Sequence, residues 1–249
     1  MPVLVAPDAF ACALRAPVVA AAIGRGLERA GCIPPDLCPV TAGGPGTLEV
    51  LLPALGGDAV DGFALVEDGA TAIVELAEDA ELTGERLAAA AAIGAVVVLL
   101  AAAGAAPKDE GAAIIAALED HGGLRGAALS VLCDVRAPGA LAVRLRDERG
   151  ARLVAGAPFV LEALGFDARM RAAHAVVVGE GRLDRSTLHG RVAGEIATRA
   201  RQSGVPCHAV VGVDAIDRFD ARILDLQAIV EASTISGLEL AGEALAAYL

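Results

Sequence analysis

A glycine-rich segment in the last third of the chain is the sharpest candidate for chemistry. The segment Gly179-Glu180-Gly181-Arg182-Leu183-Asp184-Arg185-Ser186-Thr187 follows the apolar run 175–178 and precedes a helical stretch. Its glycines would let backbone N–H groups and a helix N-terminus face an anion, and Asp184 could bind a metal ion or accept a proton. The spacing is not that of a dinucleotide-binding fingerprint, because Asp184 replaces the third glycine. The alternative is a structural strand-to-helix turn capped by Asp184 or Ser186.

A second glycine-rich segment, Gly43-Gly44-Pro45-Gly46-Thr47, lies between a predicted strand that ends at Val40 and a predicted helix. Three glycines permit a close approach of the backbone to a ligand, but Pro45 removes one N–H donor from the cradle. A tight structural turn explains the same residues equally well.

Single polar residues follow two predicted strands. Asp8 comes after the run 3–5, and Asp134 comes after the run 129–133. Ligands gather at the carboxyl ends of strands in open α/β folds, although an Asp at a strand end is also a common helix cap. His189 lies in the first turn of a predicted helix, where it would contact substrate or serve a structural purpose.

Short β-branched runs alternate with alanine-rich stretches at both ends of the chain, which predicts a parallel sheet between two layers of helices. The predicted strands there are 3–5, the run ending at 40, 175–178, 208–213 and 228–231. The predicted helices are 16–30, 47–55, 187–202, 216–226 and 238–249. The two chain ends together supply one doubly wound unit.

The middle of the chain has a different sequence pattern. The runs 63–66 and 72–76 flank the turn 67–70 and predict a β-hairpin, and the runs 140–145 and 151–155 predict a second one. Two hairpins that bracket a helix–strand–helix–strand stretch indicate an inserted, reduced mixed α/β domain. We therefore expect one domain from residues 1–56 and 161–249 and a smaller inserted domain over residues 57–160.

Composition excludes several classes of function. The chain has 249 residues and a net charge of −12, and Lys108 is its only lysine. This charge argues against nucleic acid or an anionic membrane as the main partner. Five cysteines without a C-x-x-C pair predict free thiols in a reducing cytoplasm and no zinc site. No signal peptide is expected at the N-terminus, because no basic residue flanks its short apolar run.

The stretch 87–106 carries no charged residue and is long enough to test for a membrane span. Alanine drives membrane insertion weakly, and Gly94 divides the stretch. We interpret it as a helix over 86–93 followed by a buried strand over 96–100.

Several of these motifs together resemble the bacterial glycerate kinase family, which phosphorylates D-glycerate with ATP. The resemblance rests on residues 3–8, 43–47, 160–165, 179–184 and 187–190, and more thinly on 73–75 and 133–135. It implies a flavodoxin-like parallel sheet formed by both chain ends, an inserted second α/β domain, and a site in the cleft between them. It also implies phosphorylation of D-glycerate or a similar small hydroxy acid that depends on ATP and Mg²⁺.

The resemblance further implies roles for individual residues. Asp184 would act as base or metal ligand, and Asp8 and Asp134 would organise Mg²⁺. The family pattern has a lysine and a glycine where Ala11 and Cys12 stand here, and Lys108 is the candidate to supply the missing positive charge. The glycine-rich loops would bind the substrate and nucleotide through Gly43, Gly44, Gly46, Thr47, Gly179, Glu180, Gly181, Arg182, Thr187 and His189.

The chain is shorter than a usual family member, and it departs from the family pattern where polar residues are expected. Small or apolar residues replace them at Ala9, Ala11, Ala42, Pro45, Ala105, Pro107 and Ala137, and Ser186 stands in place of a glutamine. Phosphoryl transfer depends on positioned cations and donors, so we expect ordinary kinase turnover to be absent or very slow unless Lys108, Arg182 or Arg15 replaces the lost lysine. The alternative function is an inactive relative that binds a metabolite or a partner protein. A Rossmann-type oxidoreductase is a weaker third hypothesis, because no dinucleotide fingerprint follows the first strand.

Overall fold

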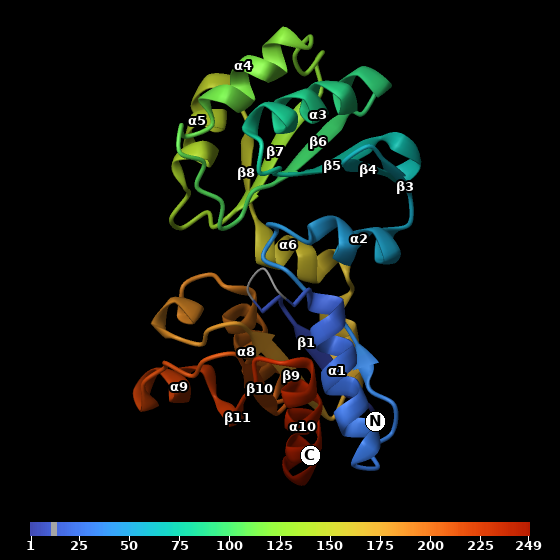
Figure 1. Cartoon of the computed structure of the whole chain (residues 1–249), viewed down its shortest axis with the longest axis vertical. Coiled ribbons are helices and arrows are strands. Elements are labelled where there is room, and N and C mark those ends of the chain that lie inside the picture. The colour runs from blue at the N-terminus through green and yellow to red at the C-terminus, as the bar shows by residue number, and fades with distance from the viewer. Residues whose placement is uncertain (11–13) are drawn as a thin grey trace. The chain divides into compact units, whose positions relative to one another are not determined.

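The computed structural model describes residues 1–10 and 14–249, and it divides them into two units (Figure 1). The first unit comprises Met1–Thr41 and Leu164–Leu249, and the second comprises Ala42–Ala163.

The sheet of the first unit is wholly parallel. Its strands are β1 (Val3–Pro7), β2 (Asp36–Leu37), β9 (Ala175–Glu180), β10 (Cys207–Val211) and β11 (Leu226–Glu231), in the order β2-β1-β9-β10-β11. Val5 pairs with Val177, which pairs in turn with His208. This confirms that the apolar runs at both chain ends are parallel neighbours. Numbered within the unit, the strand order is 2-1-3-4-5, which is the flavodoxin-like order that we expected.

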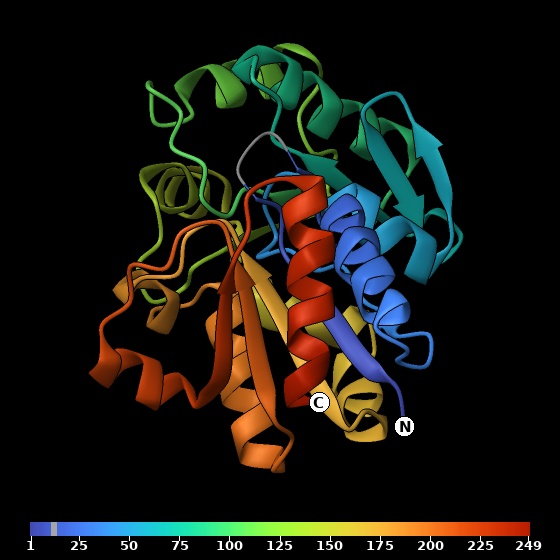
Figure 2. The ribbon, with the colours of Figure 1, turned by 60° about the horizontal axis from the view of Figure 1, so that its bottom comes forward.

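Helices cover both faces of this sheet. One face packs against α1 (Ala16–Arg29) and α10 (Ile235–Leu245), which lie side by side (Figure 2). Their shared core contains Val5, Val177 and Val210. The other helices of the unit are α7 (Phe166–Ala172), α8 (Val192–Ser203) and α9 (Arg218–Leu224), with 3₁₀ turns over Arg185–Leu188 and Ala246–Tyr248.

Two glycines let α1 and α10 approach closely. A Cβ on Gly26 would lie 2.0 Å from the carbonyl oxygen of Glu239, and one on Gly242 would lie 2.3 Å from that of Ile23. The helix backbones are thus in direct contact. Arg25 and Arg29 extend this contact with ion pairs to α10.

The sheet of the second unit is mixed. Its strands, in spatial order, are β3 (Asp58–Val60), β4 (Phe63–Val66), β5 (Thr71–Glu75), β6 (Val97–Ala101), β7 (Ala128–Cys133) and β8 (Arg152–Ala155). The first three pair antiparallel, and β5 to β8 pair parallel. Phe63 pairs with Val74 across the turn, which confirms the first predicted hairpin.

The helices of the second unit lie on both sides of its sheet (Figure 1). The helices α3 (Ala80–Ile93), α4 (Ala112–Asp120) and α5 (Ala140–Arg149) cover one face, and α2 (Thr47–Leu55) and α6 (Gly156–Ala163) lie on the other. The uncharged stretch is divided between α3 and β6, much as predicted. In the described part of the chain no helix is long and apolar enough to cross a membrane.

The second predicted hairpin is wrong. Its first half is the helix α5, and its second half is β8, which pairs parallel with β7. Leu141 and Leu145 are buried at a spacing of one helical turn, and Arg144 pairs with Glu148 across four residues. Gly150 ends the helix in the left-handed conformation, so the residues that looked like a hairpin turn form a helix C-terminus.

The first domain boundary also differs from the predicted position. We expected residues 42–56 to belong with the N-terminal strand, but the structure groups them with the inserted unit. The helix α2 packs against β4, β5 and α6, and Glu75 accepts a hydrogen bond from the amide of Leu48. These contacts fix α2 to the second unit.

Candidate functional site

The strand order of the first unit reverses between β1 and β9, and ligands of open α/β sheets bind at the carboxyl ends of strands at such a point. Asp8 and Glu180 stand there on neighbouring strands, because Pro7 pairs with Gly179. The amide of Asp8 donates to the carbonyl of Gly179 at 2.9 Å. A Cβ at Gly179 would lie 2.5 Å from that of Pro7, so this position needs glycine.

Glu180 is the centre of a buried polar network. One carboxylate oxygen accepts from the hydroxyl of Thr187 at 2.8 Å, and the other accepts from Nη1 of Arg191 at 2.8 Å. Glu180 is 7% exposed and Thr187 is 1% exposed. Burial raises the pKa of Glu180, and the hydrogen bonds from Arg191 and Thr187 oppose that rise. Both oxygens of this carboxylate therefore already have protein partners.

Asp184 caps the 3₁₀ turn that follows the glycine-rich loop. Its carboxylate accepts from the amide and hydroxyl of Ser186 and from Nε of Arg182, while its own amide donates to Thr187. The hydrogen bonds from Ser186 lower the pKa of Asp184. The structural alternative, in which Asp184 is a capping residue, thus describes one of its roles.

Asp8 is half-buried and has a different electrostatic environment. Burial raises the pKa of Asp8 from 3.8 to about 6, and the charge of Glu180 adds to the rise. The amide of Ala9, which donates to the carboxylate at 2.7 Å, and the charge of Arg191 oppose it. Asp8 therefore exchanges its proton near neutral pH, whereas Asp184 stays ionised.

Backbone hydrogen bonds hold the glycine-rich loop in place. The amide of Leu183 donates to Val213, and the amide of Val213 donates to Gly181. At the next helix, a Cβ on Gly194 would lie 1.9 Å from the carbonyl oxygen of Thr187, so α8 begins in direct contact with the 3₁₀ turn. His189 ends that turn and is exposed.

Arg191 is a site residue that the sequence motifs did not indicate. It is the N-cap of α8, and it reaches Glu180 from eleven positions along the chain. Its position just before a helix that follows a Gly-x-Gly loop is the sequence feature that could have indicated it. Ala11 and Cys12, which stand where the family pattern has a lysine and a glycine, lie outside the described residues.

The loop Gly43–Thr47 belongs to the second unit and has internal partners. The hydroxyl of Thr47 donates to the carbonyl of Gly44, and the amide of Leu48 donates to Glu75 at 2.6 Å. Burial raises the pKa of Glu75, against hydrogen bonds from the backbone at 46–48. A carboxylate of the protein thus occupies the N-terminus of α2, where the sequence suggested a phosphate.

The other predicted residues of the second unit lie at or after the carboxyl ends of its parallel strands. Asp134 follows β7, is half-buried, and accepts from the amide of Arg136 at 2.9 Å. Asp109 accepts from the amides of Gly111 and Ala113 at the start of α4. Lys108, just before it, is exposed. Whether these residues converge with Asp8 and Asp184 on one ligand stays a prediction.

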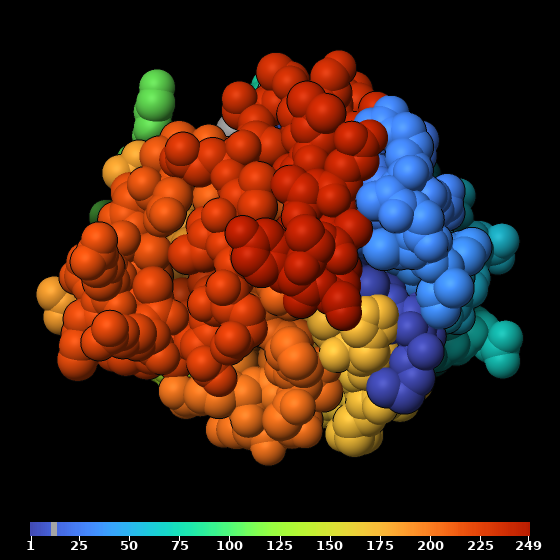
Figure 3. Space-filling view, turned by 90° about the horizontal axis from the view of Figure 1, so that it is seen from below, coloured from blue at the N-terminus to red at the C-terminus, as the bar shows by residue number. Residues whose placement is uncertain are grey.

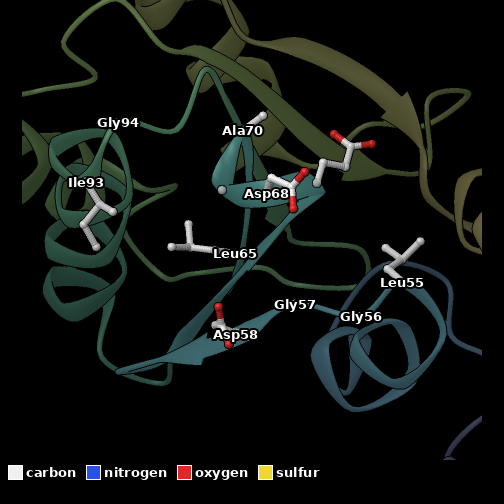
Figure 4. Close-up of a pocket in the computed structure, with 11 residues that line it drawn as sticks. Leu55, Gly56, Gly57, Asp58, Leu65, Asp68, Ala70, Ile93 and Gly94 are labelled. Atoms are coloured by element: carbon white, nitrogen blue, oxygen red, sulfur yellow. The ribbon is translucent and has the colours of Figure 1, made fainter.

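A cavity of about 690 Å³ lies at the opposite edge of the second unit's sheet, where β5 and β6 begin. Asp58 and Asp68 line it together with Leu55, Leu65 and Ile93 (Figure 4). Among residues 1–10 and 14–249, no three metal-ligating side chains gather at one point. This acidic cavity lies away from the strand ends that carry Glu75 and Asp134.

Fold and site together define a two-unit α/β protein. In its first unit, polar side chains gather at the carboxyl ends of the strands where the strand order reverses, which is where such folds bind ligands. A family model described as the glycerate kinase family matches residues 3–122 and 135–246, so the chain belongs to the glycerate kinase family. The chain is 26% identical to a glycerate kinase of Bacillus subtilis strain 168, over 85% of both proteins. That alignment spans 325 positions, more than this chain contains, so the Bacillus protein has residues without a counterpart here.

Other matches are local or structural. A glycerate kinase of Halalkalibacterium halodurans is 39% identical over 62 residues, and an uncharacterized protein of Mycobacterium bovis is 32% identical over 88 residues. The chain spans only 16% and 23% of the lengths of those two relatives. The crystal structure of a putative glycerate kinase 2 from Salmonella typhimurium LT2 matches with a TM-score of 0.72 at 20% identity, over 100% of this chain and 98% of that one. This match shows the fold.

Proposed function

We propose that the protein phosphorylates D-glycerate or a similar small hydroxy acid, with ATP and Mg²⁺. The observation that carries this proposal is Asp8, a half-buried carboxyl group with a pKa of about 6 at the reversal of strand order. A base whose pKa lies near the working pH accepts a hydroxyl proton efficiently. We assign that role to Asp8 rather than to Asp184, because Asp184 has a lowered pKa and bonds to Ser186 and Arg182.

The neighbouring residues take binding roles in this proposal. Arg191 uses Nη1 to hold Glu180, and its remaining N–H groups would bind the carboxylate of the hydroxy acid. Asp184 is exposed enough to reach a cation, with Asp134 as the second carboxylate that the family resemblance implies. The metal would neutralise the charge of the transferred phosphoryl group, and the phosphates would complete its oxygen ligands. The free thiols of Cys32, Cys38, Cys133 and Cys207 support a place in the cytoplasm.

One observation favours the second candidate, an inactive relative that binds a metabolite or a partner protein. Arg191 and Arg182, two arginines at this edge, are each paired with a carboxylate of the protein. A transferred phosphoryl group needs positive charge, and one such contact is worth roughly a thousandfold in rate. Lys108 is exposed and is the candidate to supply it. We therefore expect slow turnover rather than ordinary kinase rates.

The experiment combines ADP release with thermal melting in ATP-Mg²⁺ and D-glycerate, for the wild type and for the Lys108→Ala and Asp8→Asn variants. Slow ADP release that needs both Asp8 and Lys108 supports the kinase. Ligand-dependent melting without ADP release supports the inactive relative. Turnover at ordinary rates would contradict our expectation for the rate, and turnover unaffected by Asp8→Asn would contradict the base assigned here.

A further inference from the structure

A hollow of about 530 Å³ lies in the first unit at the amino-terminal edge of its sheet, opposite the carboxyl edge that carries Asp8 and Glu180. The end of α8, the loop before β10, the start of β11 and the C-terminal turn line it. Figure 3 shows this face, where the red C-terminal segment lies beside the orange residues of α8 and of the loop before β10. Its volume is in the range of small-molecule sites.

His208 is the buried polar group of this hollow. Its side chain is 2% exposed, and among the described residues neither ring nitrogen has a hydrogen-bond partner. An unsatisfied buried donor or acceptor costs roughly 1–3 kcal/mol, so such a group calls for an explanation. His208 shares a face of the sheet with Val210, two residues further on, and α10 covers that face and leads to Tyr248. The imidazole and Tyr248 are therefore on the same side of the sheet.

An irregularity in the sheet lies beside His208. Cys207 pairs with Leu226, but Ala209 pairs with Ile229, so β11 has one extra residue opposite His208. Such bulges interrupt the ladder and recur next to functional sites. The interruption falls at Gln227, which also lines the hollow.

The polar groups around the hollow mix donors and acceptors with balanced charge. Gln227 donates through Nε2 to the backbone and side chain of Asp225, which leaves its carbonyl oxygen as an acceptor. Arg201 donates to the carbonyl of Ile223 and has further N–H groups at the rim. Burial and the nearby His174 lower the pKa of His208, so its neutral ring offers one donor and one acceptor. With Arg201 and Asp225 offsetting each other, a simple anion is a poor match.

Tyr248 adds an aromatic surface. Its side chain is 63% exposed and lines the hollow together with Val205 and Pro206. A planar ring can stack on the phenol while its edge forms hydrogen bonds with both donors and acceptors of the hollow. We propose that this hollow binds a small planar heterocycle of the nucleobase type, stacked on Tyr248 with its edge toward His208 and Gln227. The inference does not depend on the proposed kinase function, since it concerns the other edge of the sheet.

The test uses adenosine and uridine as probes, because nucleosides lack the phosphates that a kinase site would bind. Each is titrated into the ¹⁵N-labelled full chain while long-range ¹H–¹⁵N spectra follow the rings of the four histidines. We expect saturable binding of at least one nucleoside with a shift of the His208 ring nitrogens. Tyr248→Ala and Gln227→Ala should each weaken binding at least about tenfold, which is 1.4 kcal/mol. Tyr248→Phe should retain it.

A matched control is Phe219→Ala, which removes an aromatic side chain that is 72% exposed and does not line the hollow. It should bind as the wild type does. Three results would each overturn the proposal: no saturation by either nucleoside in the millimolar range, binding that Tyr248→Ala leaves unchanged, or binding without a change at the His208 ring. The last two would place the nucleoside elsewhere and leave water as the partner of His208.

Discussion

Glu180 organises the candidate site because its two oxygens tie the 3₁₀ turn and the start of α8 to the end of β9. Thr187 is the buried side of this arrangement, and its hydroxyl also accepts from the amide of Asp184. Thr187→Val keeps the shape of the side chain but leaves a buried carboxylate oxygen and an amide without that partner. We expect the free energy of unfolding in urea to fall by about 2 kcal/mol.

Thr187→Ser is the matched control, because it keeps the hydroxyl and removes only a methyl group. It should cost clearly less than Thr187→Val. Equal losses for the two variants would mean that packing, and not the hydrogen bond to Glu180, makes this position important.

The raised pKa of Asp8 predicts how the stability of the fold depends on pH. Its folded-state pKa of about 6 lies above the ordinary 3.8, so between these values the folded protein keeps a proton that the unfolded chain has lost. Stability contributed by this proton is complete below pH 4 and is lost as the pH rises through 6. The unfolding free energy of Asp8→Asn minus that of the wild type should therefore be roughly 2 kcal/mol larger at pH 8 than at pH 4. Urea unfolding of both proteins at the two pH values measures this difference.

The same group predicts the pH profile of any turnover. If Asp8 accepts the hydroxyl proton, kcat/KM should rise with pH to a plateau, with its midpoint near the pKa of Asp8. A profile that is flat between pH 5 and pH 8 would exclude Asp8 as the base, whatever its effect on stability.

Among the helices, α1 and α10 offer a prediction with an internal control. Gly26→Ala would place a methyl group against the backbone of Glu239, which cannot move without shifting α10. Gly24→Ala, in the same helix, would meet the tips of the side chains of Leu37 and Pro35, at 3.0 and 3.3 Å. We expect Gly26→Ala to cost about 2–3 kcal/mol of unfolding free energy and Gly24→Ala to change it by at most about 1 kcal/mol. Similar effects at the two positions would contradict direct backbone contact between α1 and α10.

At the level of elements, the sequence predicted structure well where periodicity and burial agree. The strands β1, β9 and β10 are apolar runs buried on both faces, and this pattern identified them and their parallel pairing. The stretch 140–155 misled the prediction because Asp147-Glu148-Arg149-Gly150 has the composition of a hairpin turn. In the structure this stretch forms a helix instead, because the spacing of Leu141 and Leu145 lets both side chains be buried on one helical face.

The candidate site was predictable only in part, for a related reason. A residue at a strand end, such as Asp8 or Glu180, can be placed from the strand pattern alone. The pairing of Glu180 with Arg191 depends on how a 3₁₀ turn folds back, and the pairing of Glu75 with the start of α2 joins residues 27 positions apart. Tertiary contacts of this kind leave no periodic signal in the sequence.

At the scale of the whole molecule, the inserted unit is one continuous segment with its own hydrophobic core. A fragment of residues 42–163 should therefore unfold cooperatively in urea and protect the amides of β5, β6 and β7 from hydrogen exchange. The matched comparison is a chain shortened to residues 164–249, which lacks β1 and should not form the first unit's sheet. A fragment 42–163 without cooperative unfolding would show that its core needs the rest of the chain.

The position of β1 has a consequence for the newborn chain on the ribosome. Val3 pairs with Ala175, so the first strand cannot pair with β9 until the whole inserted segment has been translated. At about 5–20 residues per second this delay is on the order of ten to thirty seconds, far longer than the folding time of a typical small domain. The inserted unit would then acquire its structure first. The apolar N-terminal strand meanwhile lacks its partner on the β9 side, and chaperones could bind it there.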